Sequence, residues 1–566
     1  MNGSNRIKRD ISVVLCGEAG QGIDTIEHFL THVLKLTGFN VFATKELMSR
    51  IRGGSNSTTI RISSQRVRAF IDRIDIFIPL SKDALNHVQK RLSSKTLILS
   101  ENELPGHNFL QVQFSKIAQE LGNVVYSNIV GVGIICGIFK VPQDIINNYL
   151  KRFFLKKGDS VVQKNIEAAK SGYQIGIDLL NAKKLGIDIS PDPQIKNEII
   201  MSGSEAVALG AIAGGCNFIS AYPMTPATGV FTFLAQHAQD FEIIAEQTED
   251  EISAINMAIG AWYAGARAMT TTSGGGFDLM TEGLSLAGMQ ETPMVIHLGQ
   301  RPGPATGLPT RTEQADLKLA LYAGHGEFPR IILAPGKIED AFHLSQKAFN
   351  LADKYQVPVF ILTDQFLVDS YYNFPSLDLD NVKIERCITK TEKGYKRYQL
   401  TENGISPRGI PGFGEEVVSA DCHVHDEQGH ISENLELRTK MVNKNMKKFE
   451  TIKKNIIAPE LVGNKDYKIL AICWGSNYNV VNEALEKLDR NDISFLHFKQ
   501  VYPLHPVTID YLKNAKQTII IENNATSQFG ELIKVNTGFD IEKKILKYSG
   551  LPFSVEEVIN GIENNL

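Results

Sequence analysis

Most of this chain alternates between two hydrophobic patterns. Short, continuous apolar runs bounded by Gly, Pro or polar residues are typical of buried β-strands, and longer segments with an apolar residue every three or four positions are typical of helices. The clearest strand-like runs are Ile11–Cys16, Phe218–Ala221, Ala268–Thr272, Met294–Leu298, Arg330–Leu333, Val357–Leu362, Tyr467–Trp474, Ile493–Val501 and Thr518–Glu522. Because helical segments separate these runs, the pattern predicts α/β domains with parallel sheets.

The first part of the chain has the order strand, helix, strand. After Ile11–Cys16 come a glycine-containing turn, a helical segment that ends near Gly38 and the strand Val41–Ala43, a βαβ order. The glycines at 17, 20 and 22 do not have the spacing of a dinucleotide-binding fingerprint, and the Lys-Ser/Thr pair of a P-loop is missing. Two interpretations stay open: a tight strand-to-helix turn, or a helix N-terminus that helps to hold an anion.

A basic turn comes next. Arg50 and Arg52 precede a Gly-Gly pair, and the alternating strand Ser57–Ser63 follows. Such a turn can meet phosphate groups or form a solvated hairpin, and the sequence leaves both open. Apolar and helical segments between 125 and 187 complete this first domain, and the polar stretch Asp188–Lys196, with two prolines, is typical of a linker.

The middle of the chain carries three consecutive acids at the start of a predicted helix. We expect Thr248 to cap this helix and Glu249, Asp250 and Glu251 to fill its first turn, where the helix dipole favours anions. Glu251 lies one turn before the apolar face within Ala254–Ile259, so its carboxylate can point along the buried side. A carboxylate buried there needs a proton-bearing partner. The alternative is that all three acids are solvated.

Three further motifs each follow a predicted strand. They are Tyr222–Pro226 (YPMTP), Thr272–Gly276 (TSGGG) and Gly299–Gly303 (GQRPG). Ligands of parallel sheets bind at the carboxyl ends of the strands, so we expect the three motifs to form one shared site.

The order of these motifs resembles a known enzyme family. YPMTP, an acid on a helix, TTTSGGG and QRPGPATGLPT stand in this sequence as they do in the α subunits of 2-oxoacid:ferredoxin oxidoreductases, thiamine diphosphate enzymes, and most nearly in the 2-oxoglutarate type. The glycine turn and the RIRGG segment resemble the family's γ domain, here fused ahead of α, and IENNATSQFGELI resembles its transketolase-C-like domain. The resemblance covers nearly the whole chain. It implies a multidomain α/β protein with a γ-type α/β domain (1–187), a pyrimidine-binding thiamine diphosphate domain (197–375), a polar connecting segment (376–460) and a transketolase-C-like domain (461–566).

The resemblance also implies roles for single residues. Glu251 matches the acid that faces the pyrimidine N1′ of the cofactor and activates it, although Glu249 and Asp250 are close enough that a shifted alignment stays open. Arg301 matches the residue that grips the substrate carboxylate, which suits a planar guanidinium. The other implied contacts are Tyr222, Pro223 and Thr225 to the cofactor, Thr225 and Thr310 to the substrate, and Gly20, Gly22, Arg50 and Arg52 to coenzyme A.

Some elements of such an active site are missing from the sequence. No G-D-G segment followed by Asn is present to hold a diphosphate through magnesium, and none of the six cysteines forms a C-x-x-C pair. In the family a β subunit carries the magnesium site and the [4Fe-4S] cluster. We therefore expect a β subunit and ferredoxin as partners, an α2β2 assembly, and oxidative decarboxylation of a 2-oxoacid with CoA to acyl-CoA and CO2, or the reverse.

Two alternatives stay open. One is a broad, branched-chain or pyruvate-like 2-oxoacid as substrate, because the pocket depends partly on the β chain. The other is a non-catalytic assembly homologue, although the one departure from the family pattern, Ser204 in place of Asn, affects only a helix start.

Composition narrows the range of partners and locations. Of 566 residues, 43% are hydrophobic and 22% charged, with a net charge of −4, which gives no reason to expect nucleic acid or an anionic membrane. The longest apolar candidate, Ile129–Val141, is too short to span a bilayer, and the N-terminus lacks a signal-peptide core, so we expect a cytoplasmic protein. The stretch His423–His430 has metal-like composition, but its spacing fits no standard zinc pattern, and we expect a polar loop without a metal.

Overall fold

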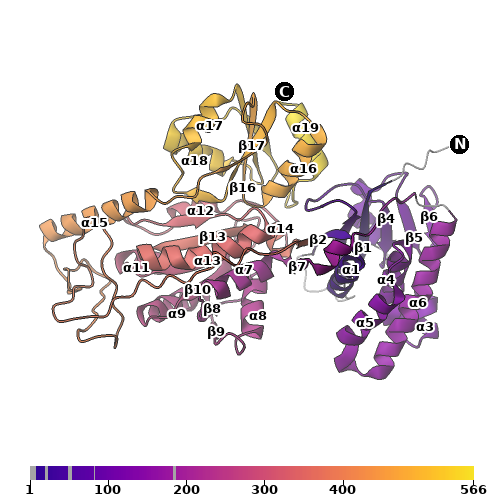
Figure 1. The fold of residues 1–566 in the computed structure, drawn as a ribbon, viewed down its shortest axis with the longest axis horizontal. Helices are drawn as coiled ribbons and strands as arrows, with labels where there is room; N and C mark the ends of the chain where they lie inside the picture. The colour runs from indigo at the N-terminus through magenta and orange to yellow at the C-terminus, as the bar shows by residue number, and fades with distance from the viewer. Residues whose placement is uncertain (1–7, 19–22, 49–53, 82, 183–185) are drawn as a thin grey trace. The chain divides into compact units, whose positions relative to one another are not determined.

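The protein is described by a computed structural model, which covers residues 8–18, 23–48, 54–81, 83–182 and 186–566 (Figure 1). The chain divides into two compact units: unit 1 comprises residues 1–202 and 369–377, and unit 2 comprises residues 203–368 and 378–566. The finer four-part division expected from the sequence stays a prediction.

Unit 1 contains a mixed sheet of eight strands in the order β6-β5-β4-β1-β3-β2-β14-β7. Strand β3 (Ser55–Ser63) lies between β1 (Asp10–Glu18) and β2 (Asn40–Glu46) and is antiparallel to both. The expected strand-helix-strand order is therefore present, but its two strands are not neighbours. The remaining strands are β4 (Ile76–Pro79), β5 (Leu97–Ser100), β6 (Phe109–Gln111), β7 (Ile199–Ser202) and β14 (Tyr371–Phe374).

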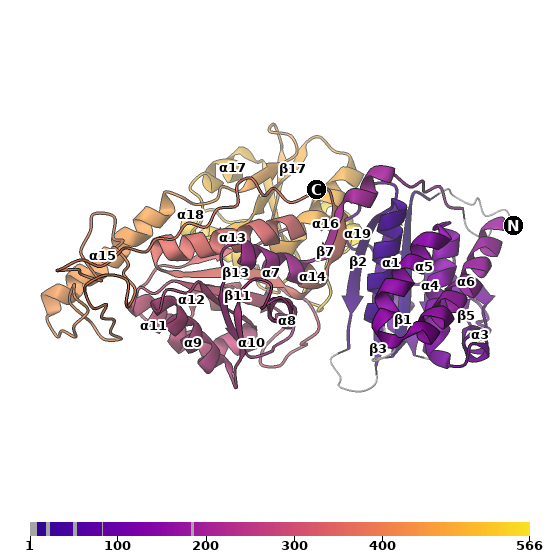
Figure 2. The same cartoon turned by 60° about the horizontal axis from the view of Figure 1, so that its bottom comes forward.

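Helices of unit 1 lie over this sheet (Figure 2). On one face they are α1 (Ile23–Thr37), α3 (Phe114–Glu120), α4 (Ser127–Ile138), α5 (Gln143–Phe154) and α6 (Asp159–Asn181), and α2 (Ala84–Val88) packs against the other face. The backbones of α4 and α6 touch at glycines: a Cβ atom on Gly133 would lie 2.2 Å from the Ala169 carbonyl oxygen, and one on Gly172 only 2.0 Å from the Val130 carbonyl oxygen. Only glycine permits this approach, which brings the two helices into direct backbone contact.

The first part of unit 2 is a seven-stranded sheet in the order β18-β12-β13-β11-β10-β8-β9, parallel except at β18. Its strands are β8 (Phe218–Ala221), β9 (Ile244–Gln247), β10 (Ala268–Ser273), β11 (Met294–Gln300), β12 (Ile331–Leu333), β13 (Pro358–Asp364) and β18 (Gln500–Tyr502). Its helices are α7 (Gly203–Ala213), α8 (Thr228–Gln236), α9 (Glu251–Tyr263), α10 (Gly274–Phe277), α11 (Thr281–Met289), α12 (Leu317–Tyr322), α13 (Ile338–Tyr355) and α14 (Gln365–Asp369). The parallel sheet predicted from the sequence is confirmed here.

The C-terminal part of unit 2 is a five-stranded sheet in the order β15-β17-β16-β19-β20. Helices α16 and α19 lie on one side of it and α17 and α18 on the other (Figure 1). The elements are β15 (Glu460–Val462), β16 (Ile469–Trp474), α16 (Tyr478–Leu488), β17 (Ile493–Phe498), α17 (Thr508–Asn514), β19 (Gln517–Glu522), α18 (Gln528–Thr537), β20 (Lys543–Leu546) and α19 (Val555–Glu563).

The segment that joins the two sheets of unit 2 contains a helix that the sequence did not predict. Residues 378–434, all described by the structure, contain no α-helix or extended strand, but α15 (Leu435–Lys453) follows. Lys444 and Lys448 of this helix are buried and both bind the carboxylate of Glu291, which precedes β11. The helix is thus attached to the seven-stranded sheet through buried charge.

Candidate functional site

The three strand-end motifs lie side by side. Strands β8, β10 and β11 are consecutive neighbours in the sheet and run parallel, so their carboxyl ends share one edge. YPMTP follows β8, the three glycines Gly274–Gly276 follow β10, and Arg301 follows β11. The Nη1 atom of Arg301 donates a hydrogen bond of 2.7 Å to the carbonyl oxygen of Thr225, which joins the first motif to the third.

Helix α9 begins at Glu251, and its N-cap is Asp250. The Asp250 carboxylate accepts a hydrogen bond of 2.8 Å from the backbone N–H of Ser253. The prediction that Thr248 caps the helix is therefore wrong: its hydroxyl donates to the carbonyl oxygen of Asp250 at 2.8 Å. Glu249 precedes the helix and is exposed, whereas Glu251 is 3% exposed. Of the three consecutive acids, only Glu251 is buried.

The Glu251 carboxylate lies against the third glycine of the TSGGG motif. A Cβ atom on Gly276 would lie 2.5 Å from Glu251 Oε1 and 2.2 Å from Thr272 Oγ1, so the approach requires glycine. Glu251 Oε1 is buried and has no hydrogen-bond partner among the described residues. Burial raises the pKa of Glu251. A hydrogen bond from the backbone N–H of Glu251 itself opposes this shift, and the negative charge of Asp250 adds to it.

This environment fits a group that shares a proton with Glu251. A buried carboxyl oxygen without a partner is unfavourable unless a donor meets it, and burial, which raises the pKa of Glu251, favours sharing a proton with such a donor. A ring nitrogen of an aminopyrimidine is such a group. The residues present are thus compatible with the pyrimidine end of thiamine diphosphate.

Arg301 places a buried positive charge at this edge of the seven-stranded sheet. Its side chain is 8% exposed, and its Nε atom is buried without a hydrogen-bond partner among the described residues. Burial lowers its pKa, an effect that the negative charge of Asp316 opposes. A guanidinium keeps its charge despite such a shift, so a donor remains available for an anionic ligand.

The other predicted site residues lie in the same turns. Tyr222 and Thr225 are exposed, Pro223 is half-buried, and Thr310 is half-buried in the loop that follows Arg301. Gly20, Gly22, Arg50 and Arg52, the predicted coenzyme A contacts, lie outside the described residues.

Sequence reasoning missed a buried histidine under the site. His297 in β11 is fully buried, with its Nδ1 atom 2.7 Å from Thr271 Oγ1 and its Nε2 atom 2.9 Å from Thr363 Oγ1. Burial lowers the pKa of His297 to about 3, so the ring is neutral at neutral pH. It links three neighbouring strands and supports the floor of the site. Its position inside an apolar run concealed it.

Sequence reasoning also missed Gln314 and Asp316, which follow the QRPGP loop. The side chain of Gln314 donates to the carbonyl oxygen of Trp474 at 2.9 Å and accepts from Asn477 at 2.9 Å and from the backbone of Asn523 at 3.0 Å. It therefore ties the loop to the C-terminal sheet of unit 2. An amide and an acid just before a short apolar helix were the only indication in the sequence, and they are common at helix starts.

The polar residues of the IENNATSQFG segment surround the carboxylate of Glu522. It is fully buried and accepts five hydrogen bonds, from Trp474, Asn524, Ser527 and the backbone N–H groups of Phe529 and Gly530. The last two donors belong to the N-terminal turn of α18. The N-terminal turn of α18 therefore binds a carboxylate of the same motif, Glu522.

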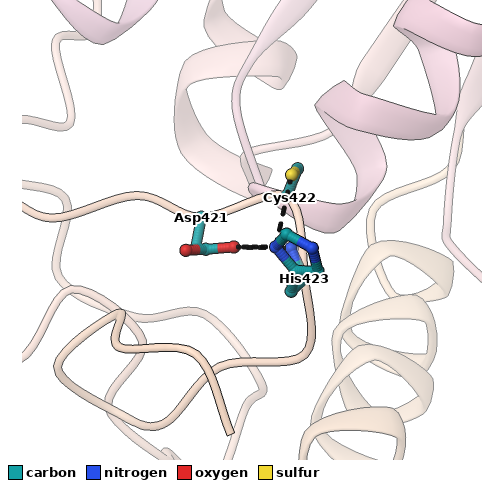
Figure 3. A group of neighbouring side chains, drawn as sticks. All are labelled: Asp421, Cys422 and His423. Carbon is teal, nitrogen blue, oxygen red and sulfur yellow. Dashed lines mark hydrogen bonds and ion pairs between the residues drawn. The ribbon is translucent and has the colours of Figure 1, made fainter.

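Asp421, Cys422 and His423 bring three potential metal ligands within 4.8 Å of one another (Figure 3). The Nδ1 atom of His423 lies 2.8 Å from the Asp421 carboxylate and 3.5 Å from the Cys422 sulfur. Cys422 and His423 are exposed. In the same stretch His425 is buried and stacks on Tyr398, with ring centroids 3.8 Å apart. These interactions hold the loop in place.

Unit 1 has a cavity of its own, of about 900 Å³. Pro79 and Ser100, at the carboxyl ends of β4 and β5, line it together with Thr25 of α1, Phe114 and Phe154. Such strand ends are where parallel sheets bind ligands.

Among the helices in the described part of the chain, none is both long and apolar enough to cross a membrane.

Two family models match the chain. One, described as pyruvate flavodoxin/ferredoxin oxidoreductase, thiamine diphosphate-binding, matches residues 209–444. The other, described as pyruvate ferredoxin/flavodoxin oxidoreductase, matches residues 12–175.

Similar proteins extend over nearly the whole chain. A 2-oxoacid:ferredoxin oxidoreductase subunit alpha from a Sulfolobus species is 33% identical over an alignment of 619 positions, which covers 97% of this chain and 96% of that protein. The 2-oxoglutarate synthase subunit KorA of Methanocaldococcus jannaschii is 34% identical over 338 residues, 59% of this chain and 91% of that subunit. A solved 2-oxoglutarate:ferredoxin oxidoreductase from Magnetococcus marinus, with 2-oxoglutarate, coenzyme A and succinyl-CoA bound, is 31% identical, with a TM-score of 0.90 over 98% of this chain and 99% of that chain.

Proposed function

The chain belongs to the α subunits of the 2-oxoacid:ferredoxin oxidoreductases, and on that basis we propose that it forms the pyrimidine-side half of an active site that oxidises 2-oxoglutarate. The observation that carries this proposal is that Glu251, a buried carboxyl group with an unpartnered oxygen, lies against the glycines that follow β10, while the buried guanidinium of Arg301 follows the neighbouring strand β11 at the same edge of the sheet. Two relatives named for 2-oxoglutarate support this choice of substrate. A broader 2-oxoacid range is the second candidate, since the Sulfolobus relative bears that wider name.

Each of the two residues has a distinct task in this proposal. Glu251 shares a proton with the pyrimidine ring nitrogen, which its burial and raised pKa permit. Arg301 holds the substrate carboxylate through charge-assisted hydrogen bonds, with its Nη1 atom anchored on Thr225. Thiamine diphosphate, when bound, supplies the carbon nucleophile and the electron sink for decarboxylation. Tyr222, Pro223 and Thr225 are the proposed contacts to that cofactor, and Thr225 and Thr310 to the substrate.

We assign the diphosphate, its magnesium ion and the iron–sulfur cluster to a β subunit. The cysteines of this chain support the assignment, because a cluster needs several thiolates close together. Among the described residues, the one group of closely spaced potential metal ligands contains a single cysteine, Cys422, and Cys16, Cys136, Cys216 and Cys473 are buried elsewhere.

The surface beside the site supports a protein partner there. Side chains on α9 and the adjoining turns are apolar yet 39–50% exposed: Tyr222, Ile252, Met257, Leu279 and Leu308. Gly260, on the same helix, has open space where a side chain would be. An apolar face around an incomplete site fits a permanent subunit, and we propose the β subunit. Ferredoxin and an α2β2 assembly remain part of the same proposal.

Coenzyme A is proposed to bind unit 1. The basic turn with Arg50 and Arg52 and the glycines Gly20 and Gly22 are the proposed phosphate contacts, and the cavity at the ends of β4 and β5 offers room for an apolar arm. Replacing both arginines by Gln should raise the KM for CoA and leave the KM for 2-oxoglutarate unchanged.

The function is tested by producing the chain together with its β subunit. CoA-dependent reduction of a dye should then be measured with 2-oxoglutarate, pyruvate and branched-chain 2-oxoacids. A kcat/KM highest for 2-oxoglutarate is expected, and comparable values for all of them would favour the broader enzyme. Absence of turnover with every 2-oxoacid, in a complex that carries cofactor and cluster, would favour a non-catalytic assembly protein.

A further inference from the structure

Asp316 occupies a second carboxylate position at the same three glycines. A Cβ atom on Gly274 would lie 2.5 Å from the Cγ, Oδ1 and Oδ2 atoms of Asp316, just as one on Gly276 would lie 2.5 Å from Glu251 Oε1. The backbone N–H of Asp316 donates to Gln300 Oε1 at 3.1 Å, so the residue is held directly against the end of β11. The Gly274–Gly276 turn therefore separates two carboxylates.

The Asp316 carboxylate and the Arg301 guanidinium carry opposite charges and attract each other, but they make no ion pair in the described part of the chain. The backbone N–H of Arg301 donates to the Asp316 carboxylate. Nevertheless, Asp316 Oδ2 and Arg301 Nε are both buried without a hydrogen-bond partner among the described residues. The two opposite charges therefore each keep one buried polar atom that no described residue satisfies.

The other charges around Asp316 are acidic. The negative charges of Asp278, which follows α10, and Glu313, in the loop before α12, both raise its pKa, and the positive charge of Arg301 opposes them. Burial is the largest effect, and together with Asp278 it raises the pKa of Asp316 to about 7. Burial also raises the pKa of Glu313.

We propose that Asp316 is a positioning residue that competes with the substrate carboxylate for Arg301 and takes up a proton when the substrate binds. The inference rests on the proposed role of Arg301. With Asp316 ionised, part of the guanidinium charge is already balanced. A second carboxylate at Arg301 then adds negative charge beside Asp316 and makes its protonation more favourable.

The sign of the pH dependence follows from this linkage. The substrate raises the pKa of Asp316 above its value in the free enzyme, so binding is strongest when Asp316 is already protonated, at pH below about 7. Between the free and the bound pKa, KM should rise by up to roughly tenfold per pH unit, because binding there costs the uptake of one proton. Both carboxylates of 2-oxoglutarate stay ionised throughout this range.

The test uses the assembled enzyme with its β subunit. KM for 2-oxoglutarate should be measured from pH 6 to pH 9 for the natural protein and for Asp316→Asn, which resembles the protonated acid in shape. The natural protein should show the rise, and Asp316→Asn should keep a nearly constant KM, several-fold lower than that of the natural protein at pH 8. Calorimetry with N-oxalylglycine, a non-reacting dicarboxylate analogue, in two buffers of different ionisation enthalpy should show proton uptake in the natural protein and none in Asp316→Asn.

Matched variants separate this inference from a structural effect and from the proposed function. Glu313→Gln removes a neighbouring acid and should shift the pH profile without flattening it. A flat KM profile in the natural protein, or an Asp316→Asn variant that keeps the natural slope and proton uptake, would overturn the role of Asp316. If Arg301→Lys leaves KM unchanged at every pH, the carboxylate role of Arg301 fails instead.

Discussion

At the scale of single residues, helix capping decides which of three consecutive acids is available for chemistry. The Asp250 carboxylate accepts a hydrogen bond from the backbone N–H of Ser253, and Glu249 precedes the helix and is exposed to solvent. Glu251, the first residue of α9, is turned inward against Gly276. The sequence predicted the acids at a helix start, but the cap is Asp250 and not Thr248, so the helix begins two residues later than expected.

Replacing Glu251 tests the proton-sharing role. In the complex with the β subunit, Glu251→Gln should abolish exchange of the thiazolium C2 proton of thiamine diphosphate, measured by NMR after acid quench, while the melting temperature changes little. The amide keeps the shape of the side chain and removes the shared proton. Glu249→Gln is the matched control and should exchange normally. Loss of exchange in Glu249→Gln together with normal exchange in Glu251→Gln would shift the assignment to Glu249.

Replacing Arg301 tests the carboxylate contact. Arg301→Lys should lower kcat/KM for 2-oxoglutarate by about 10- to 100-fold, because a charge-assisted pair contributes roughly 1.5–3 kcal/mol and Lys cannot bind a carboxylate in two places. Arg311→Lys, in the same loop but half-buried and away from the strand end, is the control. An unchanged kcat/KM for every 2-oxoacid would remove Arg301 from the substrate site.

At the scale of elements, α15 shows why some of the fold escaped the sequence. The strands around the site follow apolar runs, and most of their bounds were predicted to within two residues. In α15 the buried positions are Lys444, Lys448 and Ile452, spaced four apart, so two of the three positions that define the inner face carry charge. A periodicity of apolar residues cannot reveal such a face. The insertion of β3 between β1 and β2 was hidden for another reason, since strand pairing depends on contacts remote in sequence.

Glu291 is the counter-charge for that helix. Its burial alone would raise its pKa, but Lys448 and Lys444 hold it well below its usual range. Glu291→Gln should lower the free energy of unfolding at pH 7 by about 3–5 kcal/mol, because it leaves two buried ammonium groups uncompensated. Denaturant titration measures the change. Glu450→Gln, which removes an exposed partner of Lys453 on the same helix, should cost less than about 1 kcal/mol. Equal effects of the two changes would contradict the buried anchor.

The glycines between α4 and α6 allow a sharp comparison within one helix. Gly133→Ala would place a methyl group 2.2 Å from the carbonyl oxygen of Ala169, whereas Gly131→Ala meets nothing nearer than the Ile78 side chain at 3.9 Å. We expect Gly133→Ala to destabilise unit 1 by about 1–3 kcal/mol through overpacking. Gly131→Ala should be neutral or stabilising by up to about 1 kcal/mol, since alanine is the better helix former. Thermal unfolding of the two variants decides the matter.

At the scale of the whole molecule, the proposed function needs a second subunit to complete the site. Produced alone, the chain should be colourless, contain no stoichiometric iron and reduce no ferredoxin, because we assign the diphosphate, its magnesium ion and the cluster to the β subunit. Produced with the β subunit, it should co-purify as a stable complex with a visible absorption band from the cluster. Iron analysis and size-exclusion chromatography of both preparations measure this. A full cluster or full turnover in the isolated chain would overturn the two-subunit proposal.

The path of the chain through unit 1 has a consequence for biosynthesis. Strand β14 lies between β2 and β7, yet it emerges from the ribosome only after the parallel strands of unit 2 up to β13 have been made. At an ordinary rate of synthesis the hydrogen-bonding edge of β2 therefore waits on the order of 15–65 s for Tyr371 and Tyr372, its partners in the finished sheet. An open strand edge invites pairing with another nascent chain. A ribosome stalled before residue 369 should accordingly display a protease-sensitive β2, which becomes protected once residue 377 has left the exit tunnel.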